Sequence, residues 1–137
     1  MKAQVNNFDW PEKIKKEFDE NKFNGVVGSK LVSESSRVRV WHINLSPGDR
    51  MPFHRHALDY FWTAMTTGKS VSHQNDGSTV EHEYQVGETF HASFLKDEFM
   101  YHDLENIGDT DLVFTTVEFL DSPNTPLAID GKYRNAD

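Results

Sequence analysis

From residue 25 onward, the chain is a series of short segments in which apolar and polar residues alternate, separated by turn residues. The segments "VVGSKLVSE" and "RVRVWHINL" alternate with a period of two and are rich in β-branched residues, a pattern that favours strands. Further segments of this kind are "DYFWTAMTT", "KSVSHQ", "TVEHEYQ", "ETFHAS", "FMYHDLEN" and "LVFTTVEFL". Many short strands at regular spacing predict an all-β barrel or sandwich.

Only the beginning of the chain has a helical pattern. Trp10, Ile14 and Phe18 recur every four residues, and Pro11 falls where the first helical turn tolerates proline. This spacing predicts a short helix that lays one apolar stripe on the body of the protein. The expected organisation is a helical arm over residues 1–24, a barrel over residues 25–121, and a C-terminal tail over residues 122–137 that packs on the barrel.

Composition restricts the function classes. The 137 residues fit one domain with a core of its own. With 22 acidic and 14 basic residues, the net charge is −8, which disfavours nucleic acid and anionic membranes as partners. The sequence has no apolar run that resembles a signal peptide or approaches the ~20 residues of a membrane span. We therefore expect a soluble, cytoplasmic protein that binds a small-molecule substrate or ligand.

A histidine pair is the strongest chemical signal. His54 and His56 lie two residues apart after the turn "PGD", and side chains two apart on a strand point to the same side. Two imidazoles so placed reach one metal ion at ~2.0–2.1 Å. Since the chain has no cysteine, any metal must be held by His, Asp or Glu.

The surroundings of this pair resemble the cupin superfamily. Gly48, five further residues, the His-x-His pair, and Gly68 twelve positions after His56 are similar to the first cupin motif. His102, followed by three residues and Asn106, is similar to the end of the second motif, and "IGDTDLVF" follows it as a return into the next strand. The pair "GE" at residues 87–88 resembles the start of that second motif. The resemblance covers residues 37–120.

The resemblance implies a fold and a set of ligands. The fold is a cupin-type antiparallel β-barrel, or jelly roll, with a short N-terminal helix. The metal ligands are His54, His56 and His102. The glutamate that cupins use as a fourth ligand is replaced by Phe61, five residues after His56. The insertion "SFLKDEFMY", which delays the last histidine, is a second departure from the family pattern.

Several other residues are candidates for the site. Asp59, Tyr60, His91 and Asn106 are candidates for a fourth ligand or for hydrogen bonds to the ligands. His91 and Asn106 have structural alternatives, as a histidine at a strand end and as a strand terminator. If Phe61 faces the barrel in the glutamate's place, alternation turns Thr63 and Met65 inward and Tyr60 and Trp62 outward. The residues expected to line the pocket are Phe61, Thr63, Met65 and Leu104.

Three neutral imidazoles leave the charge of a divalent ion uncompensated and coordination positions open. Imidazole suits iron, zinc, nickel or copper; the resemblance favours iron, with zinc, nickel or manganese as alternatives. Among cupins, such sites resemble those of oxygenases, including the small enzyme that cleaves β-diketones. The leading hypothesis is a metal-dependent dioxygenase of a small carbonyl or carboxylate compound. A non-catalytic binding cupin and a metal-dependent isomerase or lyase remain as alternatives, and analogy with small cupins predicts a homodimer.

Overall fold

The structure of the chain is a computed structural model that describes residues 8–133, so the ends of the helical arm (1–7) and of the tail (134–137) lie outside the described residues. The elements, in chain order, are α1 (Glu12–Glu20), β1 (Lys30–Glu34), β2 (Val38–Leu45), β3 (Arg50–His56), β4 (Tyr60–Ala64), β5 (Gly68–His73), β6 (Thr79–Tyr84), β7 (Thr89–Ala92), β8 (Met100–Asn106), β9 (Leu112–Phe119) and the 3-10 helix η1 (Gly131–Tyr133).

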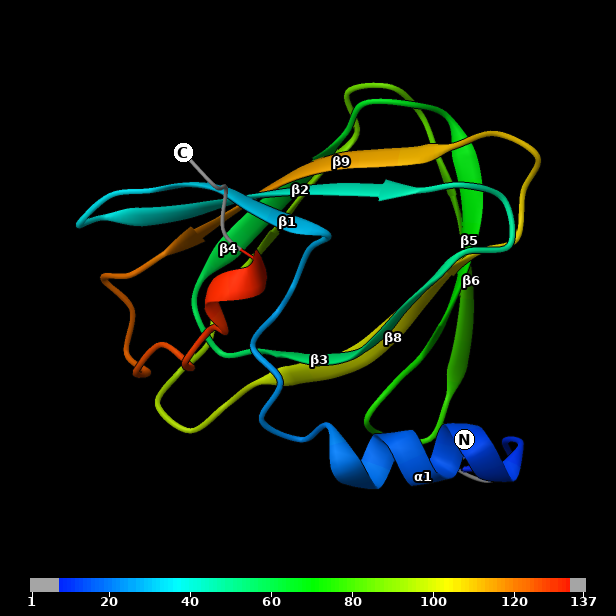
Figure 1. Ribbon diagram of the computed structural model, residues 1–137, viewed down its shortest axis with the longest axis horizontal. Helices are drawn as coiled ribbons and strands as arrows, with labels where there is room; N and C mark the ends of the chain where they lie inside the picture. Colours follow the sequence, from blue (N-terminus) through cyan, green and yellow to red (C-terminus); the bar gives the residue numbers. More distant parts are fainter. Residues whose placement is uncertain (1–7, 134–137) are drawn as a thin grey trace.

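The strands form two antiparallel sheets that face each other (Figure 1). One sheet has five strands in the order β1-β2-β9-β4-β7, and the other has four strands in the order β3-β8-β5-β6. Strands far apart in the chain are neighbours, as where β2 pairs with β9 along its whole length. This topology confirms the predicted all-β jelly-roll barrel with a short N-terminal helix.

The main core fills the space between the two sheets. Inward positions alternate with outward ones along the central strands, so that β9 buries every second residue from Leu112 to Glu118. The buried apolar side chains of this core are Ile43, Leu45, Met51, Ala64, Tyr84, Leu104, Leu112 and Phe114. This core holds the two sheets in place, and several of its side chains also line the candidate site.

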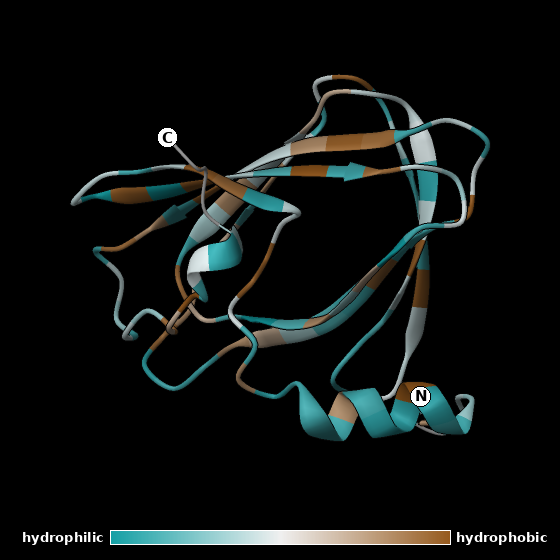
Figure 2. Cartoon of the chain, in the orientation of Figure 1, coloured by the Kyte–Doolittle hydropathy of each residue, from teal (hydrophilic) through white to brown (hydrophobic). Residues whose placement is uncertain are grey.

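Helix α1 covers the outer face of the four-stranded sheet at β3 and β8 (Figure 1). The helix is mostly hydrophilic with isolated apolar residues (Figure 2). Its expected stripe is confirmed, because Ile14 and Phe18 pack with Trp10 against the outward side chains Phe53 and Tyr101. Burial of these aromatic rings is the main attraction between the arm and the barrel.

Charged groups fix the position of the helix on this face. The Arg50 guanidinium forms two parallel hydrogen bonds of 2.8 Å to the Glu17 carboxylate, and it also donates to Asp103 Oδ2 at 2.7 Å. Asp103 is fully buried and also accepts from the backbone N–H and the ring Nδ1 of His73. A buried carboxylate is tolerated only when it is paired in this way.

The tail returns to the barrel near the beginning of β2. Ile129 and Tyr133 pack against the buried cluster of Val27, Leu31 and Trp41, and Arg39 donates a hydrogen bond to the Leu127 carbonyl. Within residues 8–133, no helix has the length and apolar character needed to cross a membrane.

Candidate metal centre

A β-bulge in β3 sets which residues face the interior. Met51 pairs with Leu104 and His54 with His102, so β3 uses one more residue than β8 between these two pairs. The extra residue lets Met51, His54 and His56 all face the interior, while Phe53 points outward beneath α1. Pro52 lies in the bulge, where the proline's missing N–H does not break the ladder.

Three histidines converge inside the barrel. His54 and His102 are cross-strand partners on β3 and β8, and His56 follows two residues after His54 on the same face. Their ring centroids lie 4.7 to 5.3 Å apart, and one ligand atom of each lies within 4.8 Å of the others. His54 and His56 are buried, and His102 is half-buried. The structure therefore brings together the three residues predicted as metal ligands.

The protonation of His54 is fixed by the backbone. Its Nδ1 lies 2.7 Å from the carbonyl oxygen of Pro52, and a carbonyl can only accept, so Nδ1 carries the proton and donates. In a neutral ring, Nε2 then has a free lone pair. A hydrogen bond that holds one ring nitrogen and frees the other is the usual support of a metal-binding histidine.

The protonation of His102 is fixed by a side chain. The Ser72 hydroxyl donates to the Asp103 carbonyl at 2.5 Å and accepts from Gln74 Nε2 at 2.9 Å. Since the hydroxyl proton is already used, Ser72 Oγ accepts from His102 Nδ1, which lies 3.3 Å away. Nε2 of His102 is therefore also unprotonated.

Burial keeps all three rings neutral. Desolvation lowers the pKa of His54 to about 4, although the Pro52 carbonyl opposes the change. The pKa values of His56 and His102 lie well below the ordinary value of 6.5, because of desolvation first and the neighbouring His54 second. Neutral imidazole is the form that binds a metal ion, so the cluster needs no deprotonation near neutral pH.

The cluster fits a divalent transition metal ion. His56 Nδ1 is buried and has no hydrogen-bond partner among the described residues. An imidazole nitrogen left in this way is satisfied by a bound ion or a buried water molecule. One ring nitrogen from each of the three histidines lies within 4.8 Å of the others, and such a set of imidazole donors suits zinc, iron, nickel or copper.

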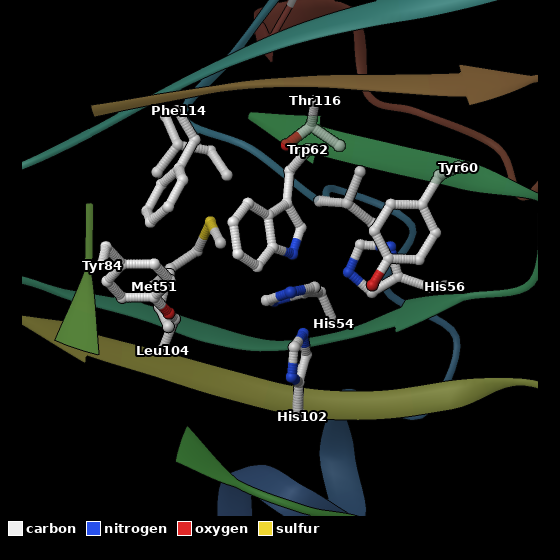
Figure 3. Close-up of a pocket in the computed structure, with 12 residues that line it drawn as sticks. Met51, His54, His56, Tyr60, Trp62, Tyr84, His102, Leu104, Phe114 and Thr116 are labelled. Carbon is white, nitrogen blue, oxygen red and sulfur yellow. The ribbon is translucent and has the colours of Figure 1, made fainter. Parts of the chain in front are cut away.

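The histidines form one wall of a small pocket between the sheets (Figure 3). Its volume is about 50 Å³, far below the ~300–1,000 Å³ of pockets for drug-sized ligands. The remaining lining residues are Val27, Ile43, Met51, Tyr60, Trp62, Tyr84, Leu104, Phe114 and Thr116. Among the described residues, the lining contains no carboxylate, lysine or arginine.

The two pocket phenols are neutral. Tyr60 stacks on His56 with a centroid separation of 4.1 Å, and burial raises its pKa. Burial also raises the pKa of Tyr84, whose hydroxyl lies 2.8 Å from Ser70 Oγ. Thr116 Oγ1 is buried and has no hydrogen-bond partner among residues 8–133.

The prediction of which β4 side chains face the barrel interior is wrong. Tyr60 and Trp62 line the pocket, whereas Phe61 packs on the outer face against His91 and Phe119. Thr63 bonds to Thr89 and Met65 is half exposed, so neither lines the pocket. The physical reason is the pairing with β9, because Tyr60, Trp62 and Ala64 lie opposite β9 residues that point inward. Leu104 lines the pocket as expected.

The other candidates have different positions. Tyr60 is the only one of them on the pocket wall within the described chain, beside His56. Asp59 instead accepts from the backbone N–H of Phe94, and His91 is exposed on β7. Asn106 donates to the carbonyls of Leu45 and Thr110, so it closes the turn after β8, the structural alternative for this residue. These contacts occupy the side chains of Asp59 and Asn106 away from the histidines.

Ser72 and Thr116 were not identified from the sequence, although each has a polar atom at the site. A signal for Thr116 exists in "LVFTTVEFL", where alternation places it on the same face as the buried Phe114. Ser72 carries no such signal, because its role depends on β5 lying beside β8. Residues that act through the pairing of distant strands leave no local pattern.

Solved structures similar to this chain support the assignment of the fold. A cupin domain from Bordetella pertussis Tohama I is 28% identical, over 72% of this chain and 96% of that one, with a TM-score of 0.58. A protein with a double-stranded β-helix domain from Klebsiella pneumoniae subsp. pneumoniae is 21% identical, over 82% of this chain and 95% of that one, with a TM-score of 0.54. An RmlC-like cupin family protein from Methanocaldococcus jannaschii is 22% identical, over 64% and 73% of the two chains, with a TM-score of 0.51. No protein-family model and no curated protein matches the chain.

Proposed function

This chain is a member of the cupin superfamily, and we propose that it is a metal-dependent oxygenase of a small carbonyl or carboxylate compound. His54, His56 and His102 would hold a divalent transition metal, with iron as the first choice. The observation that carries the proposal is the convergence of three neutral imidazoles in a pocket whose described lining has no charged group.

The ligand set determines what chemistry the site supports. His54, His56 and His102 would hold a divalent ion without neutralising its charge, and such an ion would supply Lewis-acid and oxygen chemistry to a small substrate. The protein's own contribution is to hold the rings through Pro52 and Ser72 and to exclude water with apolar walls. A dry, apolar site protects reactive oxygen chemistry from competing reactions with water.

The same pocket is poorly suited to proton transfer. An isomerase or lyase needs a general acid or base whose pKa lies near the working pH. Apart from the three histidines, the titratable groups on the described wall are Tyr60 and Tyr84, and burial raises the pKa of both. Oxygen chemistry at a metal is therefore favoured over isomerisation.

A non-catalytic binding cupin is the second candidate, and the size of the pocket favours it. A volume of about 50 Å³ accommodates an ion with a few small ligands, and a larger substrate requires the walls to move. A protein that only binds a metal or a very small metabolite needs no such movement.

Metal content is the first test. The protein is purified without a polyhistidine tag or chelators, and bound metals are measured by mass spectrometry. His102→Ala is compared with His42→Ala, a matched control because His42 is exposed on β2. We expect a near-stoichiometric transition metal in the wild type and in the control, and its loss in His102→Ala. No metal in the wild type, even after reconstitution, contradicts the proposal.

Oxygen uptake then separates the two candidates. The Fe(II)-loaded protein is mixed with 2,4-pentanedione, a small β-diketone, in an oxygen electrode. The oxygenase consumes dioxygen only when both iron and the diketone are present, and His102→Ala does not. Turnover without oxygen indicates an isomerase or lyase instead. Metal binding without any turnover across a panel of small carbonyl and carboxylate compounds indicates the binding cupin.

A further inference from the structure

Thr116 faces the histidines across the pocket (Figure 3). It belongs to the five-stranded sheet, between Trp41 on β2 and Trp62 on β4, whereas the histidines project from the opposite sheet. The side chain is 1% exposed, and its hydroxyl has no hydrogen-bond partner among the described residues.

A buried hydroxyl without a partner destabilises a protein, because it loses its hydrogen bonds to water and gains none. Valine has almost the same shape as threonine and would fill this position without that loss. Buried polar atoms are otherwise nearly always paired. An unpaired hydroxyl on the wall of a pocket therefore points to a partner that enters the pocket.

The charge of the site indicates what that partner is. If the three histidines hold a divalent ion, no carboxylate on the described wall neutralises it. An anionic ligand with oxygen donors is then preferred over a neutral one, since charge is costly to bury uncompensated. The opposite end of the pocket is formed by Met51, Leu104 and Phe114 with the ring of Tyr84, whose hydroxyl is paired with Ser70, and it suits a short hydrocarbon group.

We infer that Thr116 is a specificity-determining residue, whose hydroxyl donates a hydrogen bond to an oxygen atom of a small anionic chelating ligand bound at the three-histidine site. The ligand class is an enolate or carboxylate with a short apolar group. This inference rests on the proposed function, because it needs a metal at the histidines, but it does not need turnover.

The test uses the full chain loaded with zinc, which binds without redox chemistry. The affinity for 2,4-pentanedione is measured by calorimetry for the wild type, Thr116→Val and Thr116→Ser, and the zinc content of each is measured beside it. We expect Thr116→Val to bind the diketone about tenfold more weakly, the effect of one hydrogen bond. Thr116→Ser keeps the hydroxyl and should bind within about twofold of the wild type. All three should hold equal zinc.

The thermal midpoint of the metal-free protein is a second readout. Because Thr116→Val removes an unpaired hydroxyl, its midpoint should rise by about 3 °C relative to the wild type. A higher midpoint together with a weaker affinity for the diketone in Thr116→Val would show that the hydroxyl serves ligand binding and not folding stability. A merely structural hydroxyl would lower the midpoint when removed.

The outcomes separate the two proposals. If the wild type does not bind zinc, the proposed function fails. If zinc binds but the diketone does not, the metal site stands and the ligand class inferred here is wrong. If Thr116→Val binds the diketone as tightly as the wild type, the role of Thr116 is refuted.

Discussion

The carboxyl group of Glu118 is buried against Trp41 and should make the stability of the protein depend on pH. Glu118 is 3% exposed, and its Oε1 accepts a hydrogen bond of 2.8 Å from Trp41 Nε1. The nearby Arg39 is paired with Glu34 at 2.9 Å. Desolvation therefore dominates, and it raises the pKa of Glu118 from 4.5 to about 7.

Glutamine at this position tests that environment. The amide of Glu118→Gln has the shape of the neutral acid, and its oxygen can still accept from Trp41. The difference between 4.5 and about 7 corresponds to about 3 kcal/mol, at about 1.4 kcal/mol for each pH unit. Since the folded state holds the proton more tightly, the wild type loses this stability as pH rises from 4.5 through 7.

The assay is urea unfolding of the wild type and Glu118→Gln near pH 5 and near pH 8. Glu118→Gln should be more stable than the wild type by up to about 3 kcal/mol at the higher pH, and by much less at the lower pH. Glu81→Gln, at an exposed position on β6, is the control and should change little at either pH. An equal effect of Glu118→Gln at both pH values would refute the reasoning.

Two further predictions concern the supports of the site and of the helix. Ser72→Ala removes the acceptor of His102 Nδ1, so metal affinity measured by competition with a chelator should fall about 10- to 100-fold; unchanged affinity would show that His102 needs no such support. Arg50→Met leaves the Glu17 carboxylate and the 1% exposed Asp103 side chain without their guanidinium, and urea unfolding should show a loss of about 3–5 kcal/mol. Lys15→Ala, which breaks only an exposed pair within α1, is the control for the second change and should stay close to the wild type.

The fold and two of the three histidines, His54 and His56, could be predicted because their signals are local. Alternation within short segments shows strands directly, and two histidines in the sequence His-x-His share a side on any regular strand. The third, His102, required the resemblance to a second motif, since 46 positions separate it from His56.

Which face of β4 turns toward the barrel interior could not be predicted from the residues of β4 alone. "DYFWTAMTT" is aromatic on both faces, so burial does not favour one face over the other. The choice is made by β9, where the buried Phe114 and Thr116 lie opposite Ala64 and Trp62. Spacing from the histidine pair therefore does not predict whether a residue beyond the next loop, such as Phe61, faces the interior.

The bulge in β3 makes the hydrogen-bond support of His54 less open to substitution than that of His102. Within the bulge, the Pro52 carbonyl oxygen accepts the hydrogen bond from His54 Nδ1. Because this partner is a backbone carbonyl, every residue type at position 52 would still carry it. The equivalent partner of His102 is the Ser72 hydroxyl, which a single codon change deletes. Substitution at residue 72 can therefore change the basicity of His102. The basicity of His54 depends instead on the backbone conformation at Pro52 and changes only if that conformation changes.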